Sequence, residues 1–297
     1  MFDLRYHVAS LTAVFLALAI GILVGVGISG RGFVDDAERR QLNAEIARLQ
    51  ASVEEARVRN DELEDRQAAA EEFVEGAYPV LVDDRLAGRD VAVVVVGSPD
   101  ATLDWVLRAL DEADARLLRL RALRAPLRIA EVAAILESQP SLGGYVGDEY
   151  LEDVGRDLGR EFAAGGTTPL WDALEQEVVI ERSGAMTGAA DAVVVVRAAP
   201  PQGAETARFL AGFYSGTASV GEPVVGVEGS RADDSAIPIF QRHRMSTVDG
   251  VDTPVGRLAL VLLLGGGARG DYGVRDTADD GILPPIEALP SVTTTGG

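Results

Sequence analysis

The sequence predicts an α/β protein in three parts: an N-terminal transmembrane helix, a long coiled-coil helix, and a mostly parallel, Rossmann-like sheet covered by helices. Three observations predict it: an uncharged apolar run near the N-terminus, a series of heptads over residues 39–74, and an alternation of apolar strand-like runs with helical segments beyond them. The expected boundaries are a membrane anchor at 1–30, a stalk at 31–77, an extracytoplasmic α/β domain at 78–280 and a disordered tail at 281–297.

The anchor is predicted from residues 8–28, which are 21 positions without a charge. A helix of about 20 apolar residues spans the hydrocarbon layer of a bilayer. Arg5 flanks one end and an acidic segment follows the other, which favours a cytoplasmic N-terminus with the bulk of the chain outside the cytoplasm. A cleaved signal peptide is the alternative, but the run is long and lacks an A-x-A-like cleavage site.

Small residues at four-residue spacing, Ala17, Gly21 and Gly25, lie on one face of the predicted anchor. Such a face lets two membrane helices approach closely, although Gly is also common in membrane helices generally. Gly25, Gly27 and Gly30 satisfy the pattern G-x-G-x-x-G, but a dinucleotide site needs a preceding strand and a following helix, so this match is discarded.

The stalk is predicted from apolar residues that recur at heptad positions without an interrupting Pro or Gly until Gly76. Two chains anchored by their N-termini in one membrane would pair in parallel, which predicts a homodimer. The alternatives are a helix lying on its own domain and a stalk completed by a different protein. The predicted interface residues are Leu42, Ile46, Leu49, Val53, Ala56, Asn60, Leu63, Gln67 and Ala70.

Asn60 is a polar residue at a seam position, and the only other Asn in the chain is Asn43. An Asn at this position costs stability but specifies register and a two-stranded state. The seam beyond Val53 is weak, because it contains small and polar residues. Arg59 is expected to face Glu64 of a partner helix, and Arg66 to face Glu71, which favours parallel pairing.

The α/β domain is predicted from four strand-like runs at 91–96, 191–196, 222–229 and 256–266. Helical segments separate them, including one around residues 204–214 and a mainly helical stretch over 127–180. Continuous apolar runs separated by helices indicate a mostly parallel sheet covered on both faces.

Ligands of such sheets bind outside the carboxyl ends of the strands. The loops expected there are 97–100, 197–201, 228–234 and 265–273. The Gly-rich last loop has backbone amides for an anion but lacks the G-K-[ST] of a P-loop, and Gly-rich turns are commonly a matter of geometry. The carboxylates of 228–234 suit a hard cation, although a solvated loop explains them more simply.

Composition excludes several kinds of chemistry. The net charge of −20 argues against nucleic-acid binding, and the absence of Cys removes disulfides and thiol catalysis. No enzyme motif is found, so no catalytic residue and no cofactor are assigned. An arrangement of Ser, His and Asp through His243 stays open, but no motif marks a nucleophile. His243 and Met245 are the only close pair of soft metal ligands.

Two end motifs carry a resemblance to a known family. The stretches "STVDGVDTPVGRLALVLLL" (246–264) and "GARGDYG" (267–273), with the opening "LRYHVASLTAVFLALAIGILVG" (4–25), resemble the MctB-type copper transport protein family. The resemblance implies a membrane-anchored envelope protein linked to copper export or homeostasis, described as an outer-membrane channel. It also implies a relationship to septal proteins that control peptidoglycan hydrolases with a partner membrane protein.

Two functional hypotheses follow. The first is a structural protein whose stalk or loops bind an envelope or membrane protein. The second is copper export or homeostasis, as the family name states. Copper(I) sites favour Cys, Met or His, and this chain has no Cys, three Met and two His.

Overall fold

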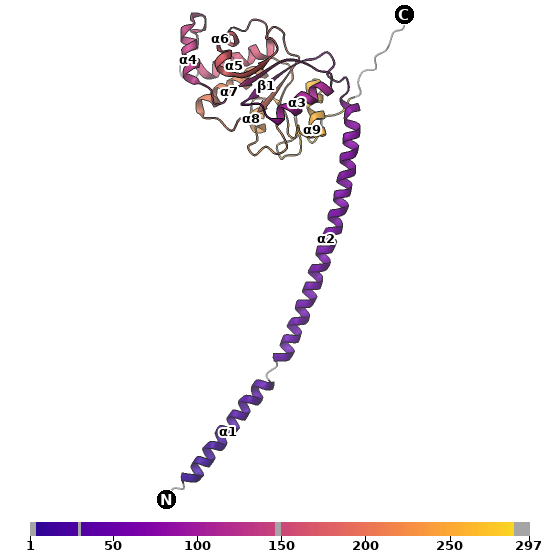
Figure 1. The fold of residues 1–297 in the computed structure, drawn as a ribbon, viewed down its shortest axis with the longest axis vertical. Coiled ribbons are helices and arrows are strands. Elements are labelled where there is room, and N and C mark those ends of the chain that lie inside the picture. The colour runs from indigo at the N-terminus through magenta and orange to yellow at the C-terminus, as the bar shows by residue number, and fades with distance from the viewer. Residues whose placement is uncertain (1–3, 29–30, 146–149, 288–297) are drawn as a thin grey trace, which may run out of the picture. The chain divides into compact units, whose positions relative to one another are not determined.

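The computed structural model describes residues 4–28, 31–145 and 150–287 (Figure 1). The chain divides into two compact units, Met1–Ala70 and Glu71–Gly297. The first unit holds helix α1 (Leu4–Ile28) and most of helix α2 (Arg31–Val82). The second unit holds the last turns of α2 and the whole α/β fold.

Helix α1 has the length and composition of a membrane span. Its segment Val8–Gly27 has a mean hydropathy of 2.5, and its side chains are exposed within the single chain. Apolar side chains around the whole helix are what a lipid environment requires, since lipid tails cannot hydrate polar groups. The predicted anchor therefore coincides with one helix that is long and apolar enough to cross a membrane.

Helix α2 is a single helix of 52 residues, which agrees with the helix expected for the stalk. It continues through Gly76 and Pro79, and it ends only at Val82, past the expected end of the stalk. Tyr78 and Val82 on its last turns are buried in the core of the α/β fold. Packing of these turns onto the domain offsets the helix-breaking tendency of Pro79. Pairing of α2 with a second helix stays a prediction.

The predicted, mostly parallel sheet is confirmed. Seven strands lie in the order β3-β2-β1-β4-β5-β6-β7. All neighbouring pairs are parallel except β2 and β3, so one antiparallel strand closes one edge. The strands are β1 (Asp90–Val96), β2 (Arg116–Leu123), β3 (Val179–Ser183), β4 (Ala192–Arg197), β5 (Val224–Val227), β6 (Ser246–Val248) and β7 (Asp271–Tyr272).

Helices cover both faces of the sheet, and each face has its own apolar core. Helices α4 to α8 pack on one face, while α3, α9 and the end of α2 pack on the other (Figure 1). The helical segments are α3 (Ala101–Glu112), α4 (Ile129–Ser138), the 3-10 turn η1 (Pro140–Leu142), α5 (Tyr150–Ala164), α6 (Pro169–Val178), α7 (Ala204–Ala218), α8 (Ile237–Arg242) and α9 (Pro254–Leu264).

Strand β1 shows why its valine run lies at the centre of the sheet. Side chains alternate between faces of a strand, so Val94 and Val96 enter one core while Val93 and Val95 enter the other. All four valines are fully buried. A continuous β-branched run is the pattern of a strand with both faces covered.

Helices α5 and α7 pack against each other through glycines, two on each helix. A Cβ at Gly212 would lie 2.0 Å from the carbonyl oxygen of Glu152, and one at Gly155 would lie 2.1 Å from that of Phe209. Neither position has room for a side chain. The two backbones lie this close because Gly has no Cβ.

One predicted strand is wrong, because residues 256–266 belong mainly to helix α9. Thr253 caps the helix by accepting a hydrogen bond from the Gly256 amide, and Pro254 occupies its first turn. The helix is buried on nearly all sides, so its sequence has no amphipathic period to separate it from a buried strand. Its abundance of Leu over β-branched residues was the available signal.

The first part of the predicted tail, residues 281–287, is described by the structure. Residues 288–297 of the predicted disordered segment lie outside the described residues. Leu283, in the same predicted segment, packs against the core, and Arg85 donates a hydrogen bond of 2.9 Å to the carbonyl oxygen of Glu287. The α/β fold therefore includes chain beyond residue 280.

The glycine contact between α5 and α7 predicts a large effect of one methyl group. Gly212→Ala should lower the free energy of unfolding by about 2 kcal/mol, because the added Cβ collides with backbone. Gly76→Ala is the matched control, since a Cβ there meets nothing within 4 Å and Ala favours helix. Denaturant unfolding of both variants checks this, and an equal or larger loss in Gly76→Ala would contradict it.

Candidate functional site

A cleft of about 490 Å³ lies at the carboxyl ends of β1, β4 and β5. Strands β2 and β5 lie on opposite sides of the β1–β4 pair, so the connections leaving β1 and β4 diverge to opposite sides. Open α/β sheets bind ligands at such a switch point. Three loops predicted from the sequence, 97–100, 197–201 and 228–234, contribute to this cleft.

The loop after β1, residues 97–100, leaves little room for a dinucleotide. Gly97 has a φ of 104°, and a Cβ on it would lie 2.8 Å from the Ala199 Cβ, so the loops after β1 and β4 touch. Asp100 caps α3 by accepting a hydrogen bond of 2.9 Å from the Thr102 amide. The helix N-terminus thus already holds a carboxylate of its own, where a phosphate would otherwise bind.

The acidic loop after β5 is used to hold the fold together. Glu228 is 4% exposed and accepts hydrogen bonds from the Ser235 hydroxyl at 2.9 Å and the Ala236 amide at 2.7 Å. Arg275 lies 3.4 Å from the same carboxylate and donates to the carbonyl oxygens of Ser230 and Ala232. The predicted cation ligand is therefore committed to an internal network.

A second buried carboxylate extends this network. Asp249 accepts hydrogen bonds from the amides of Val274 and Arg275 at 2.8 and 3.1 Å. Asp252 accepts from the Ser230 amide and hydroxyl at 2.7 and 2.6 Å. Burial alone would raise the pKa of Asp252, but the bonds from Ser230, together with the backbone amide of Asp252 and the charge of Arg231, hold that pKa below its ordinary value. These contacts join three loops at one edge of the sheet.

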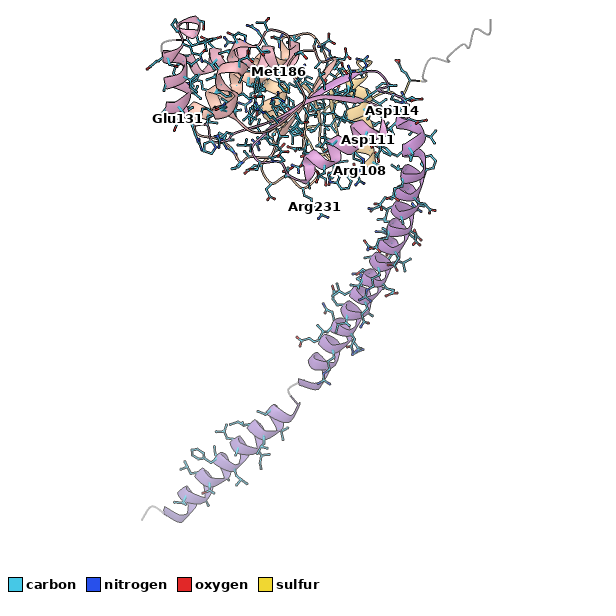
Figure 2. The ribbon with its side chains drawn as sticks, turned by 45° about the horizontal axis from the view of Figure 1, so that its top comes forward. Arg108, Asp111, Asp114, Glu131, Met186 and Arg231 are labelled. Carbon is cyan, nitrogen blue, oxygen red and sulfur yellow. The ribbon has the colours of Figure 1, made fainter. Side chains whose placement is uncertain are left out.

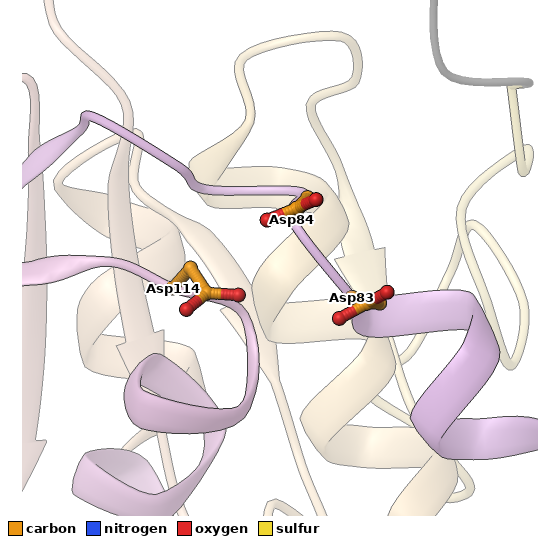
Figure 3. A group of neighbouring side chains, drawn as sticks. All are labelled: Asp83, Asp84 and Asp114. Carbon is orange, nitrogen blue, oxygen red and sulfur yellow. The ribbon is translucent and has the colours of Figure 1, made fainter.

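The remaining acids of the loop do not complete a cation site. Asp233 and Asp234 are exposed, and Arg197 donates to the carbonyl oxygen of Asp234. Among the described residues, one group of acids could hold a metal, namely Asp83, Asp84 and Asp114 (Figure 3). Their oxygens lie within 4.8 Å of one another and suit hard cations rather than copper(I). All three side chains are exposed, and we assign no metal to them.

The two predicted soft ligands lie in different environments. Met245 is 4% exposed and belongs to the apolar core under α8. His243 lines a pocket of about 230 Å³ beside Tyr214 and Leu210. Burial, with a further contribution from Arg242, lowers the pKa of His243, so the imidazole is neutral at neutral pH. Met245 is explained by packing, and His243 is the accessible ligand of the two.

His243 is also the candidate histidine of a Ser, His and Asp triad. Its Nδ1 lies 2.9 Å from the Ser215 hydroxyl oxygen. A triad requires a third group that orients the imidazole. Within the described part of the chain, no carboxylate is hydrogen-bonded to His243. The pair is therefore an isolated hydrogen bond between α7 and the end of α8.

The predicted seam residues lie along the exposed surface of α2. Leu42, Ile46, Leu49, Val53 and Leu63 are all at least 45% exposed in the single chain. The ion pairs expected between chains are replaced within this one by Arg59–Glu55 at 2.7 Å and Arg66–Glu62 at 3.9 Å.

Asn60 is likewise bonded within its own helix, and donates to Glu64 at 2.6 Å. Exposed pairs of this kind contribute only a few tenths of a kcal/mol and exchange readily for contacts with a partner. On the membrane helix, a Cβ at Gly21 or Gly25 would meet nothing within 4 Å, and Ala17 shares the exposed surface. The apolar members of the predicted seam and the small residues of the membrane helix are thus exposed within their own helices.

The Arg275 network predicts a stability effect at the cleft. Arg275→Ala should lower the free energy of unfolding by about 2–3 kcal/mol, because it leaves Glu228 buried without its cation. Arg231→Ala is the matched control, since Arg231 lies exposed on the same edge (Figure 2). Thermal or denaturant unfolding measures both, and a variant pair of equal stability would show that the network is not needed.

Comparison with known proteins adds an independent result. A sequence model of the family "Copper transport outer membrane protein, MctB" matches residues 1–283. Two similar relatives are the copper transporter MctB of Mycobacterium bovis and that of Mycobacterium tuberculosis. Each is 27% identical over 311 aligned positions, which cover 92% of this chain and 96% of the relative. The match extends over the anchor, the long helix and the α/β fold together, and the chain therefore belongs to the MctB family.

Proposed function

We propose that this chain is a single-pass, membrane-anchored assembly protein of the cell envelope, in which α2 pairs in parallel with a second copy. The observation that carries the proposal is the exposed apolar seam of α2 beside an apolar helix able to span a membrane. The N-terminus lies in the cytoplasm and the α/β domain outside it, since the flanking charges favour that orientation.

Burial energetics favour pairing. The strong half of the seam holds Leu42, Ile46, Leu49 and Val53, and a fully buried aliphatic side chain contributes roughly 1.5–3 kcal/mol. In a parallel pair, the second copy places the same four residues at the same level along the helix axis. The same surface of each chain therefore forms the contact. The intrahelical pairs seen in the single chain are too weak to compete.

The weak half of the seam is where a different protein joins the two paired helices. Ala56, Asn60, Gln67 and Ala70 bury little apolar surface in a homodimer, and Asn60 sets the register. An envelope or membrane protein with a complementary helix completes this part. In the finer form of the proposal, suggested by the family resemblance, that partner belongs to the septum and the assembly regulates peptidoglycan hydrolysis. No catalytic role is assigned to this chain.

Cysteine crosslinking tests the pairing, because the natural chain has no Cys. Val53→Cys and Leu63→Cys lie on the seam, so mild oxidation of membranes should trap each as a dimer. Asp65→Cys is the matched control: it lies on the outer side of the helix in the same heptads and should stay monomeric.

Gel mobility under non-reducing conditions reads the result. Monomers alone from both seam variants, without adducts to other proteins, would exclude pairing through α2. Equal crosslinking of Asp65→Cys would show random collision in the membrane.

Copper homeostasis is the second candidate function, and the names of the relatives favour it equally. In this chain His243 is an accessible soft ligand outside the membrane segment, and its neutral imidazole lines the 230 Å³ pocket. One imidazole does not make a tight copper(I) site, which normally has two or more soft ligands. We therefore propose that the chain contributes to copper handling through the proteins it assembles with.

A pair of histidine variants separates the two functions. If the chain acts by assembly, His243→Ala should leave the copper tolerance of a complemented deletion strain and the copper(I) uptake of the purified protein unchanged. His7→Ala is the control for the other histidine. Loss of uptake and tolerance in His243→Ala alone would contradict the assembly proposal and favour direct transport.

A further inference from the structure

A second pocket, of about 290 Å³, lies at the amino ends of the strands, opposite the switch-point cleft. Its lining residues lie at or just before the starts of β1, β5, β6 and β7, or at and just after the ends of α7 and α9. The Gly-rich loop 265–273, expected at the carboxyl edge, contributes here because α9 is a helix rather than a strand. Because α9 runs back across the sheet as a helix, it brings this loop to the amino ends of the strands, where arginines from other loops lie.

Three arginines line this pocket, namely Arg89, Arg244 and Arg269. Arg89 is half-buried before β1 and donates a hydrogen bond of 2.8 Å to the carbonyl oxygen of Gly265. Arg244 precedes β6 and has a φ of 61°, a backbone conformation that residues other than Gly rarely adopt. Across residues 31–145 and 150–287, none of the three is ion-paired with a carboxylate.

The net charge of the pocket lining is positive even when its negatively charged groups are counted. Glu222 is the one carboxylate of the lining. The carboxyl ends of α7 and α9 face the pocket as well, and each helix end carries a partial charge of about −0.5. Three arginines outweigh these groups by about one elementary charge. In a chain with a net charge of −20, this local excess of positive charge requires an explanation.

We propose that this pocket binds the phosphate group of a small ligand. Guanidinium forks match phosphate oxygens with two parallel hydrogen bonds, and arginines from three loops would surround one phosphate on several sides. Ser246 also lines the pocket, and its oxygen accepts a hydrogen bond of 3.2 Å from the Gly270 amide, so its hydroxyl proton is free to donate. The volume suits a group of phosphate size with a short attachment.

This inference is independent of stalk pairing, because the pocket lies wholly within the second compact unit. It also differs from a P-loop or Rossmann site, where phosphate meets a helix N-terminus. Here side-chain cations supply the recognition, and the carbonyl oxygen of Gly265 at the end of α9 holds Arg89 in place. The ligand would therefore bind without any contact to the switch-point cleft.

Calorimetric titration of the full-length protein in detergent tests the proposal. Inorganic phosphate, glycerol 3-phosphate and dihexanoyl phosphatidylglycerol are the three probes, and chloride at equal ionic strength is the blank. We expect saturable binding of at least one phosphate probe with one site per chain. Preference for glycerol 3-phosphate would identify a soluble ligand, and preference for the short-chain lipid would identify a headgroup.

Variants assign the binding to this pocket. Arg244→Gln and Arg269→Gln should each weaken it by about tenfold or more, because each removes a charged hydrogen bond from exposed residues that the fold does not need. Arg231→Gln removes the same charge from the opposite edge of the sheet and should leave affinity unchanged. Unfolding midpoints confirm that all three variants are folded. No saturable binding, or equal weakening in all three variants, would overturn the proposal.

Discussion

The exposed apolar seam of α2 constrains every functional interpretation of this protein. One continuous helix passes through two environments: Tyr78 and Val82 are buried in their own domain, whereas Leu42 to Leu63 expose an apolar stripe. Water does not favour an exposed apolar stripe of this kind. The α/β fold is complete without it, with both sheet faces covered and a core on each. The stripe is thus available for a second helix.

The fold was predictable from sequence where the signal is local. The valine runs of β1 and β4 are buried on both faces, as their composition indicates. Helix α9 was missed because a leucine-rich segment buried all round has no period. The short strands β6 and β7, of three and two residues, have too few positions for a pattern.

The candidate sites, too, were predictable from sequence only where they follow from local patterns or from topology. The switch-point loops follow from topology, so the sequence places 97–100 and 228–234 correctly at the cleft. The Glu228–Arg275 contact joins residues distant in sequence, and no spacing rule identifies it. The pocket lined by the three arginines was harder still to predict. Its cations come from three loops, and its position depends on α9 being a helix. In the proposed assembly role this chain would not have to hold copper itself, which suits a member of a copper-transport family with no Cys and a buried Met245.

The most direct test of parallel pairing is the distance between spin labels on two copies of the full-length protein in membranes. Labels placed separately at Ala44 and at Asp65 lie on the outer side of the predicted seam, roughly 30 Å apart along the helix. Parallel pairing predicts the same interchain distance at both sites, since the axes of paired helices lie about 10 Å apart throughout their length. Loss of the interchain signal, or clearly different distances at the two sites, would contradict it.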